Sequence, residues 1–186
     1  MSKRAIVSVT LMFLAAVLIL SSQSWASCTA PANAIEAENC ITTGSTPQSV
    51  WDVGTPPNSG SGDSTIQGFG DNISVNVGDT INFKVKTTAT SFHLDIYRMG
   101  YYQGNGARKI TTITGTPRTQ PNCLTNSGTG LYDCGNWQVS ASWTVPTTAV
   151  SGIYFARAVR NDTGGASHIM FIVRNDASHS DILFQA

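Results

Sequence analysis

The stretch WQVSASWTVP, residues 137–146, decides the fold class of this chain, because it places an apolar side chain at every second position. A period of two is typical of a β-strand that buries one face, and Pro146 ends the run. Trp137 and Trp143 fall on the apolar face, so we expect both rings in the core. The stretch therefore predicts a half-buried strand rather than a helix.

The same alternation recurs on both sides of this stretch. Residues 73–77 and 81–86 alternate around a turn at Gly78-Asp79, with Ile73 on the apolar face, and residues 153–160 are apolar on both faces, as suits a central strand. The predicted strands lie at 73–77, 81–86, 92–97, 110–113, 137–145, 153–160 and 168–174. About seven strands separated by turn signals predict an all-β fold, an immunoglobulin-like antiparallel β-sandwich.

The composition agrees with this fold and excludes several classes of protein. The chain has 186 residues with 11 basic and 11 acidic side chains, and after residue 26 only four Leu, three Lys and two Glu remain. Good helix formers are thus scarce, which excludes a helical bundle. Without Lys3 and Arg4 the remaining nine basic residues face 11 acidic ones, a net charge of −2. We therefore expect no nucleic-acid partner held by bulk positive charge.

Residues 1–26 have the pattern of a signal peptide. Lys3 and Arg4 precede an uncharged apolar run at residues 5–20, and Ser24 and Ala26 fit the −3 and −1 positions of a cleavage site before Ser27. The run has 16 residues, fewer than the roughly 20 of a spanning helix, so an uncleaved anchor is the weaker alternative. We expect an exported protein, periplasmic or secreted, with no membrane attachment after cleavage.

The expected organisation is one sandwich with flanking segments. Residues 1–26 form the signal peptide, 27–71 a loop-rich segment packed on the sandwich, 72–176 the immunoglobulin-like β-sandwich and 177–186 a truncated linker strand. The four cysteines, Cys28, Cys40, Cys123 and Cys134, predict two disulfides in an exported chain. Three connectivities are possible, and we favour Cys28–Cys40 and Cys123–Cys134 because each pair is close in sequence.

The Gly-rich loop at residues 100–109 has no Gly-Lys-Ser/Thr ending and no following helix, so it does not predict a phosphate site. A plain strand connection is its simplest interpretation. Alternatively, Tyr101 and Tyr102 lie exposed beside Arg98 and Arg108 and form a contact surface for a glycan or a neighbouring domain, since aromatic and Arg side chains are favoured interface anchors.

No set of residues in the sequence predicts a catalytic or metal-binding site. His93-Leu94-Asp95, His168 and His179-Ser180-Asp181 are scattered, and we expect solvent-facing strand positions rather than a metal site. No nucleophile elbow supports a hydrolase triad, and Glu36 and Glu38 are a poor pair for glycoside hydrolysis. We expect no catalytic residue, no cofactor and no metal ligand. Trp51 lies in the loop-rich segment and is placed to cap one sheet.

Several stretches together resemble the N-terminal part of N,N-dimethylformamidase large-subunit-like proteins, over roughly residues 35–185. They are LDIYRMGYY at 94–102, GNGAR at 104–108, CGNW at 134–137, SGIYFAR at 151–157 and SDILFQ at 180–185. The resemblance implies a β-sandwich ahead of a large catalytic domain, and an iron held there by two Tyr and a Glu. SDILFQ lies at the entry to that domain, so we carry no iron ligand over to this chain.

The resemblance implies ancestry and fold more directly than activity. We expect an exported, non-catalytic module, in a truncated or accessory form, that is not an enzyme on its own. A first alternative is a subunit of an N,N-dimethylformamidase-like amidohydrolase that a separate catalytic chain completes. A second alternative is a carbohydrate- or surface-binding module that uses the loop of Tyr101 and Tyr102.

Overall fold

A computed structural model describes residues 28–53 and 62–179 of the chain. Its internal contacts divide the chain into two units, residues 1–37 and 38–186, and the sandwich belongs to the second. The expected signal peptide and the SDILFQ stretch lie outside the described residues. In the first unit, Asn33 caps the helix that follows, because its Oδ1 accepts hydrogen bonds from the backbone N–H groups of Ile35 and Glu36.

The described residues are mostly β-strand, which confirms the all-β class. In chain order the elements are α2 (Ala34–Asn39), β1 (Ser45–Thr46), α3 (Gln48–Trp51), β2 (Ile66–Gly70), β3 (Ser74–Asn76), β4 (Thr80–Thr87), β5 (Phe92–Met99), the 3-10 turn η1 (Tyr102–Gly104), β6 (Ala107–Gly115), β7 (Leu124–Asn126), β8 (Leu131–Asp133), β9 (Ala141–Thr144), β10 (Gly152–Arg160) and β11 (Ala166–Arg174). Strand β2 lies in the segment expected to be loop-rich. The proposed division at residue 71 stays a prediction.

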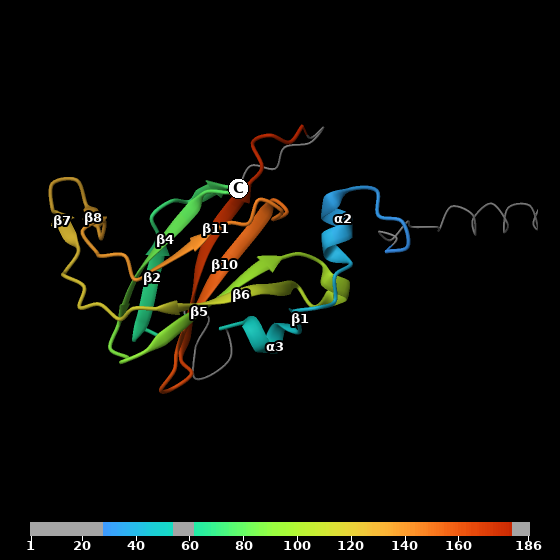
Figure 1. The fold of residues 1–186 in the computed structure, drawn as a ribbon. Coiled ribbons are helices and arrows are strands. Elements are labelled where there is room, and N and C mark those ends of the chain that lie inside the picture. The colour runs from blue at the N-terminus through green and yellow to red at the C-terminus, as the bar shows by residue number, and fades with distance from the viewer. Residues whose placement is uncertain (1–27, 54–61, 180–186) are drawn as a thin grey trace, which may run out of the picture. The chain divides into compact units, whose positions relative to one another are not determined.

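Two sheets face each other across one core (Figure 1). The larger sheet has the order β1-β6-β5-β10-β11-β3, and the smaller has the order β2-β4-β9. Phe83 and Trp143 of the smaller sheet contact Phe171 of the larger at ring-centroid distances of 5.7 and 6.0 Å, both edge to face. Aromatic pairs in this geometry add to the stabilisation from apolar burial.

The strand pairing differs from the expectation in two ways. The described residues hold eleven strands rather than about seven, partly because β7 and β8 form a separate hairpin that stands apart from both sheets (Figure 1). Strand β3 runs parallel to β11, whereas we expected an antiparallel sandwich. After β2 the chain crosses to the edge of the larger sheet, and the predicted turn at Gly78-Asp79 returns it to the smaller sheet. Residues 73–77 and 80–87 therefore form no hairpin.

Three positions on the predicted apolar faces lie outside the core: Ile73, Trp137 and Val139, of which Val139 is 39% exposed. Ile73 is 85% exposed, because it precedes the first paired residue of β3. The alternation of apolar residues begins at Trp137, but the strand that it predicts, β9, begins only at Ala141. Backbone N–H groups upstream have other acceptors: that of Trp137 donates to the Cys134 carbonyl at 3.0 Å, and that of Gln138 to the Gln120 side chain at 2.8 Å. Trp143 is buried as predicted, whereas Trp137 is half-buried outside the core cluster.

Candidate functional site

The four residues predicted to form a contact surface do not share one environment. Tyr101 is 57% exposed, whereas Arg98 and Tyr102 retain 3% and 1% of their surface and Arg108 is largely covered. Three of the four thus point inward, and the predicted exposure of Tyr102 and Arg98 is wrong. Their partners come from a distant part of the chain, at Glu38, which the loop sequence does not reveal.

The loop after β5 folds back sharply enough to turn Tyr102 inward. Tyr102 and Gln103 adopt φ values of 38° and 56°, in the left-handed region that side chains with a Cβ rarely occupy. Gly106 has a φ of 82° and lies against the Trp51 ring, with no room for a side chain. The Trp51 indole N–H donates to the carbonyls of Thr46 and Asn105 at 3.2 and 3.0 Å. Trp51 thus anchors α3 to this loop.

Arg98 uses its guanidinium to join three segments. Its Nη1 donates to the Tyr102 hydroxyl oxygen at 3.1 Å and to the Met99 carbonyl at 3.2 Å. Its Nε and Nη2 donate to the carbonyls of Val150 and Ser151 at 3.3 and 3.0 Å. A buried guanidinium needs such partners, since an unsatisfied charged donor is costly. Arg98 therefore fastens the loop to the chain before β10.

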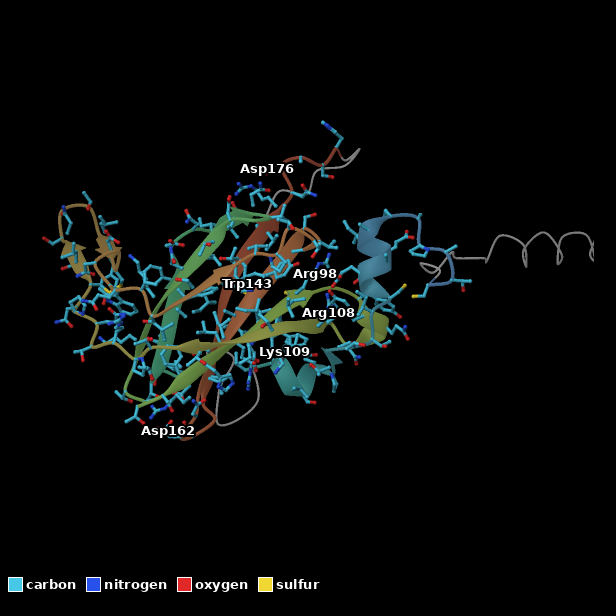
Figure 2. The ribbon with its side chains drawn as sticks, in the orientation of Figure 1. Arg98, Arg108, Lys109, Trp143, Asp162 and Asp176 are labelled. Atoms are coloured by element: carbon cyan, nitrogen blue, oxygen red, sulfur yellow. A yellow bond between two sulfur atoms is a disulfide. The ribbon has the colours of Figure 1, made fainter. Side chains whose placement is uncertain are left out.

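Glu38 completes the cluster from the end of α2. Its Oε1 accepts a hydrogen bond from the Tyr102 hydroxyl at 2.8 Å, and two more from Nε and Nη2 of Arg108 at 2.8 and 2.6 Å. Glu38 is buried, and the Arg108 side chain is 19% exposed. Figure 2 shows Arg98 and Arg108 close together at one end of β5 and β6. We call Glu38, Arg98, Tyr102 and Arg108 the Glu38 cluster.

Asn39 adds a second contact between the same segments. Its Oδ1 accepts a hydrogen bond from the Tyr101 backbone N–H at 2.7 Å, and it occupies the space that a side chain at Gly100 would need. Residues 38 and 39 together thus hold both faces of the loop, and only glycine fits at position 100.

The electrostatic environment keeps the phenols of the cluster protonated. Burial raises the pKa of Tyr102, and its hydrogen bond to Glu38 acts in the same direction. Burial also raises the pKa of nearby Tyr154, whose hydroxyl donates to the Val150 carbonyl at 2.7 Å. Every side chain of the cluster thus makes polar contacts within the fold. The cluster acts as a clasp, by which we mean that it holds together the end of α2, the loop after β5 and the start of β6.

A comparison with protein families bears on the origin of this clasp. The family model "N,N-dimethylformamidase beta subunit-like, C-terminal" matches residues 93–186, which is half of the chain and includes Arg98, Tyr102 and Arg108. The chain belongs to this family. The match confirms the resemblance but places it only loosely, because the model is named for the C-terminal region, whereas we expected the N-terminal part.

The part of the chain that matches this N,N-dimethylformamidase beta subunit-like family begins in β5, so it does not include Glu38. The strands β2, β3 and β4 also lie outside the matched residues. The Glu38 cluster therefore joins the part of the chain that carries the family signal to a part that does not. No sequence among the curated proteins matches the chain.

Among solved structures, an AA10 lytic polysaccharide monooxygenase from Streptomyces lividans is similar at 21% sequence identity, over 54% of this chain and 56% of that chain, with a TM-score of 0.29. The chain thus spans a little more than half of that protein's length. At this level of similarity the likeness carries no information about activity.

The remaining predicted site residues of this family member are dispersed. Asp95 is buried rather than solvent-facing. Its carboxylate accepts hydrogen bonds from the Thr112 hydroxyl at 2.5 Å and the Lys109 ammonium at 3.2 Å. The His93 Nε2 atom lies 3.7 Å from the same carboxylate. His168 donates from Nε2 to the Trp51 carbonyl at 2.6 Å. Strand β10 separates these two histidines. Asp181 lies outside the described residues, among which no three potential metal ligands group together.

All four cysteines are in disulfides. Cys123 and Cys134 are joined across the base of the β7–β8 hairpin, with their Cα atoms 4.3 Å apart, and Cys28 and Cys40 are each disulfide-bonded. Disulfides persist in oxidising compartments, so they are consistent with the expected export. No helix in the described part of the chain is long and apolar enough to cross a membrane.

Proposed function

We propose that the chain is an exported, non-catalytic β-sandwich module that accompanies the catalytic portion of an N,N-dimethylformamidase-like enzyme. The observation that supports this proposal is the use of the most specific motif, IYRMGYY. Its Arg98 and Tyr102 side chains are buried and make hydrogen bonds within the fold rather than facing a substrate. The motif thus encodes the clasp of the Glu38 cluster.

The clasp suits an architectural role on physical grounds. A buried carboxylate that accepts three hydrogen bonds from Tyr102 and Arg108 is held in one geometry, and its contacts are made within the fold. Such a cluster specifies how segment 38–51 lies on the loop and on β6. The family name adds a second candidate: a beta subunit whose catalytic site is completed by a separate chain.

An assay of the full chain separates these candidates. We expect purified protein to release no dimethylamine from N,N-dimethylformamide above the no-protein rate. Turnover by the chain alone, lost in Glu38→Gln and kept in Glu36→Gln, would overturn the proposal. Hydrolysis that arises only when the chain is mixed with a separate catalytic chain of the family would establish the subunit alternative instead.

Export is tested by the mature N-terminus. Cleavage before Ser27 predicts that intact-mass analysis of protein from the periplasm or medium finds residues 27–186 with both disulfides formed. Protein that retains residue 1 and accumulates in the cytoplasm with reduced cysteines would contradict export without affecting the structural role.

A further inference from the structure

An aromatic pair lies on the outer face of the smaller sheet. Phe69 of β2 and Trp137 have ring centroids 5.7 Å apart at an interplanar angle of 42°. Both side chains are half-buried, on the side of the sheet opposite the core residues Phe83 and Val85. The Trp137 indole N–H donates to the Pro121 carbonyl at 3.0 Å, which fixes the orientation of its ring. The pair is thus a rigid, partly exposed aromatic surface.

Positive charge gathers on the same face. Lys84 and Lys86 alternate with core residues along β4, and their ammonium nitrogens lie 5.9 Å from the ring centroids of Phe69 and Trp137 respectively. This distance is the outer limit of a cation–π contact. Only three lysines follow residue 26, and two of them lie here. Lys84 also donates from Nζ to the Gly135 carbonyl at 2.7 Å, so Lys86 is the lysine of this face that remains available to a ligand.

A hollow of about 620 Å³ adjoins this face and is lined by Lys86, Gln67 and the segment from Pro117 to Gln120. None of its lining residues is acidic. Lys86 and Arg118 are exposed, and within the described part of the chain their side chains have no hydrogen bond or ion pair, although the Lys86 ammonium lies near the Trp137 ring. Two cations without a counter-charge therefore border one hollow, and the hollow attracts anions.

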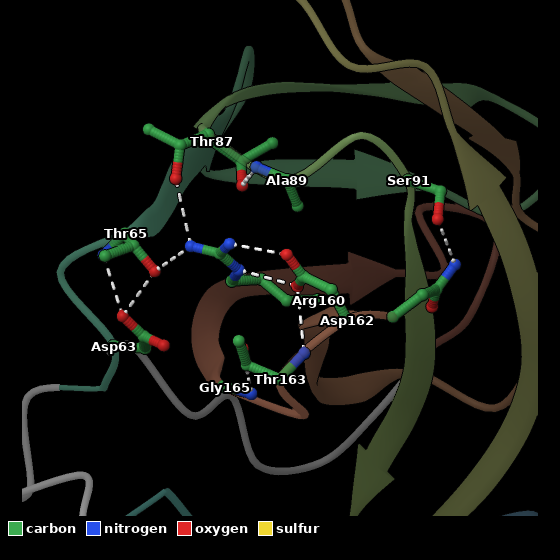
Figure 3. Close-up of polar contacts among 11 residues, drawn as sticks. Asp63, Thr65, Thr87, Ala89, Ser91, Arg160, Asp162, Thr163 and Gly165 are labelled. Carbon is green, nitrogen blue, oxygen red and sulfur yellow. Dashed lines mark hydrogen bonds and ion pairs between the residues drawn. The ribbon is translucent and has the colours of Figure 1, made fainter.

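The walls of the hollow are fixed by contacts behind it. The Arg160 Nη1 donates to the hydroxyl oxygens of Thr65 and Thr88 at 2.5 and 3.0 Å, while Asp162 neutralises the guanidinium at 2.7 Å (Figure 3). On the other side, the buried Gln120 side chain donates to the carbonyls of Val85 and Gln138. These contacts hold the walls of the hollow in one geometry, and the Gln120 amide is used within the fold.

We propose that this surface, formed by Phe69, Trp137, Lys86, Arg118 and the adjoining hollow, binds a polysaccharide that carries carboxylate groups. The C–H face of a sugar ring is slightly positive and packs on the negative face of an aromatic ring. Sugar hydroxyls find partners in the threonines and in Gln67, and the carboxylates pair with the two free cations. An acidic peptide is the less favoured ligand, because the hollow has no apolar groove to hold side chains.

Binding of the full chain to oligogalacturonate in 50 mM salt, measured by calorimetry, tests this inference. We expect saturable binding that weakens as salt is raised, because screening acts on exposed charges. The double variant Lys86→Gln/Arg118→Gln should lose roughly tenfold in affinity, since it removes two exposed charges and keeps polar side chains at both positions. Trp137→Ala should lose a similar factor, roughly tenfold, through the lost stacking surface.

Matched variants elsewhere control for charge and for aromatic surface. Tyr101→Ala removes an exposed ring from the loop between β5 and β6, and Arg174→Gln removes an exposed cation that pairs with Asp176; both should bind within about twofold of the native chain. Absence of oligogalacturonate binding, or equal losses in Tyr101→Ala and Trp137→Ala, would overturn the proposal. Equally tight binding of polyglutamate or of neutral dextran would also do so. None of these outcomes depends on the proposed architectural role.

Discussion

Glu38 is the residue on which the Glu38 cluster depends, and it lies 64 positions from Tyr102 and 70 from Arg108 in the sequence. Sequence reasoning singled out Arg98, Tyr102 and Arg108 but assigned them to the surface. Glu38 is considered there only with Glu36, as a poor pair for glycoside hydrolysis because the two lie two positions apart. No local pattern links a carboxylate to a guanidinium so far away, so the motif could be found from sequence but its role could not.

Replacing Glu38 with Gln should destabilise the protein by about 2 kcal/mol, because it leaves the largely buried Arg108 without its counter-charge. Urea unfolding followed by tryptophan fluorescence measures the change. Glu36→Gln is the matched control, since Glu36 accepts one exposed backbone hydrogen bond from Ala32, and it should change stability by at most about 0.5 kcal/mol. Equal effects of the two variants would mean that the cluster contributes little.

His168 makes the stability depend on pH. Burial lowers the pKa of His168 below its usual 6.5, so the unfolded chain binds a proton before the folded chain does. Stability from this group is therefore complete above pH 6.5 and falls as the pH drops below it. The shifted carboxyls act in a lower range: hydrogen bonds from Arg160 hold the pKa of Asp162 at about 2.

Thermal unfolding at several pH values between about 7 and 5 measures this effect. The melting temperature should fall on acidification, and His168→Gln should flatten the dependence while keeping a donor near the Trp51 carbonyl. A variant with an unchanged slope would show that His168 is not the responsible group.

At the scale of elements, the alternation of apolar residues predicted strands well where the whole segment pairs in a sheet. Residues 81–86, 92–97 and 168–174 all lie in strands, with their expected apolar residues buried. Residues 137–140 show the same pattern, but the Gln138 backbone bonds with the Gln120 side chain and the Trp137 N–H donates to the Cys134 carbonyl. Periodicity reports which side chains prefer burial, and backbone partners decide whether a strand forms.

The β7–β8 hairpin depends on its disulfide more than the sheets do. Leu124, Leu131 and Tyr132 are 60%, 58% and 71% exposed, so little apolar burial holds the hairpin, and a lone two-stranded hairpin is marginal in water. Closing the loop between Cys123 and Cys134 contributes about 2–3 kcal/mol in the chain-entropy model.

The double variant Cys123→Ser/Cys134→Ser should therefore lose amide-exchange protection in residues 124–133 while β5 and β10 keep theirs. Hydrogen–deuterium exchange with mass spectrometry resolves the two regions. A uniform loss of protection across both sheets would instead mean that the disulfide supports the core.

For the whole molecule, the family match and the fold have different boundaries. The match covers β5 to β11, but Ile81, Phe83 and Val85 of β4 fill the core against them. Sheet order and the parallel β3–β11 pair lie beyond what local sequence patterns encode, because they depend on which faces meet after collapse. The class of fold could be predicted, and its topology could not.

A fragment of residues 93–186 should not fold by itself, because the inner face of the larger sheet, including Tyr154 and Phe171, would be left without β4. We expect it to bind a hydrophobic dye and to unfold without a cooperative transition, whereas residues 28–186 unfold cooperatively. Circular dichroism and urea titration compare the two. A cooperative transition in the shorter fragment would contradict this account of the core.

The sheet order also has a consequence for how the protein is made. Strand β3, at residues 74–76, has its described sheet partner only at residues 172–174, and β10 and β11 occupy the middle of the larger sheet. A chain that emerges from the ribosome N-terminus first therefore cannot complete this sheet until nearly all of it has been synthesised. Closure of the larger sheet is therefore a late step that joins residues far apart in the sequence, and such long-range strand pairing is intrinsically slow.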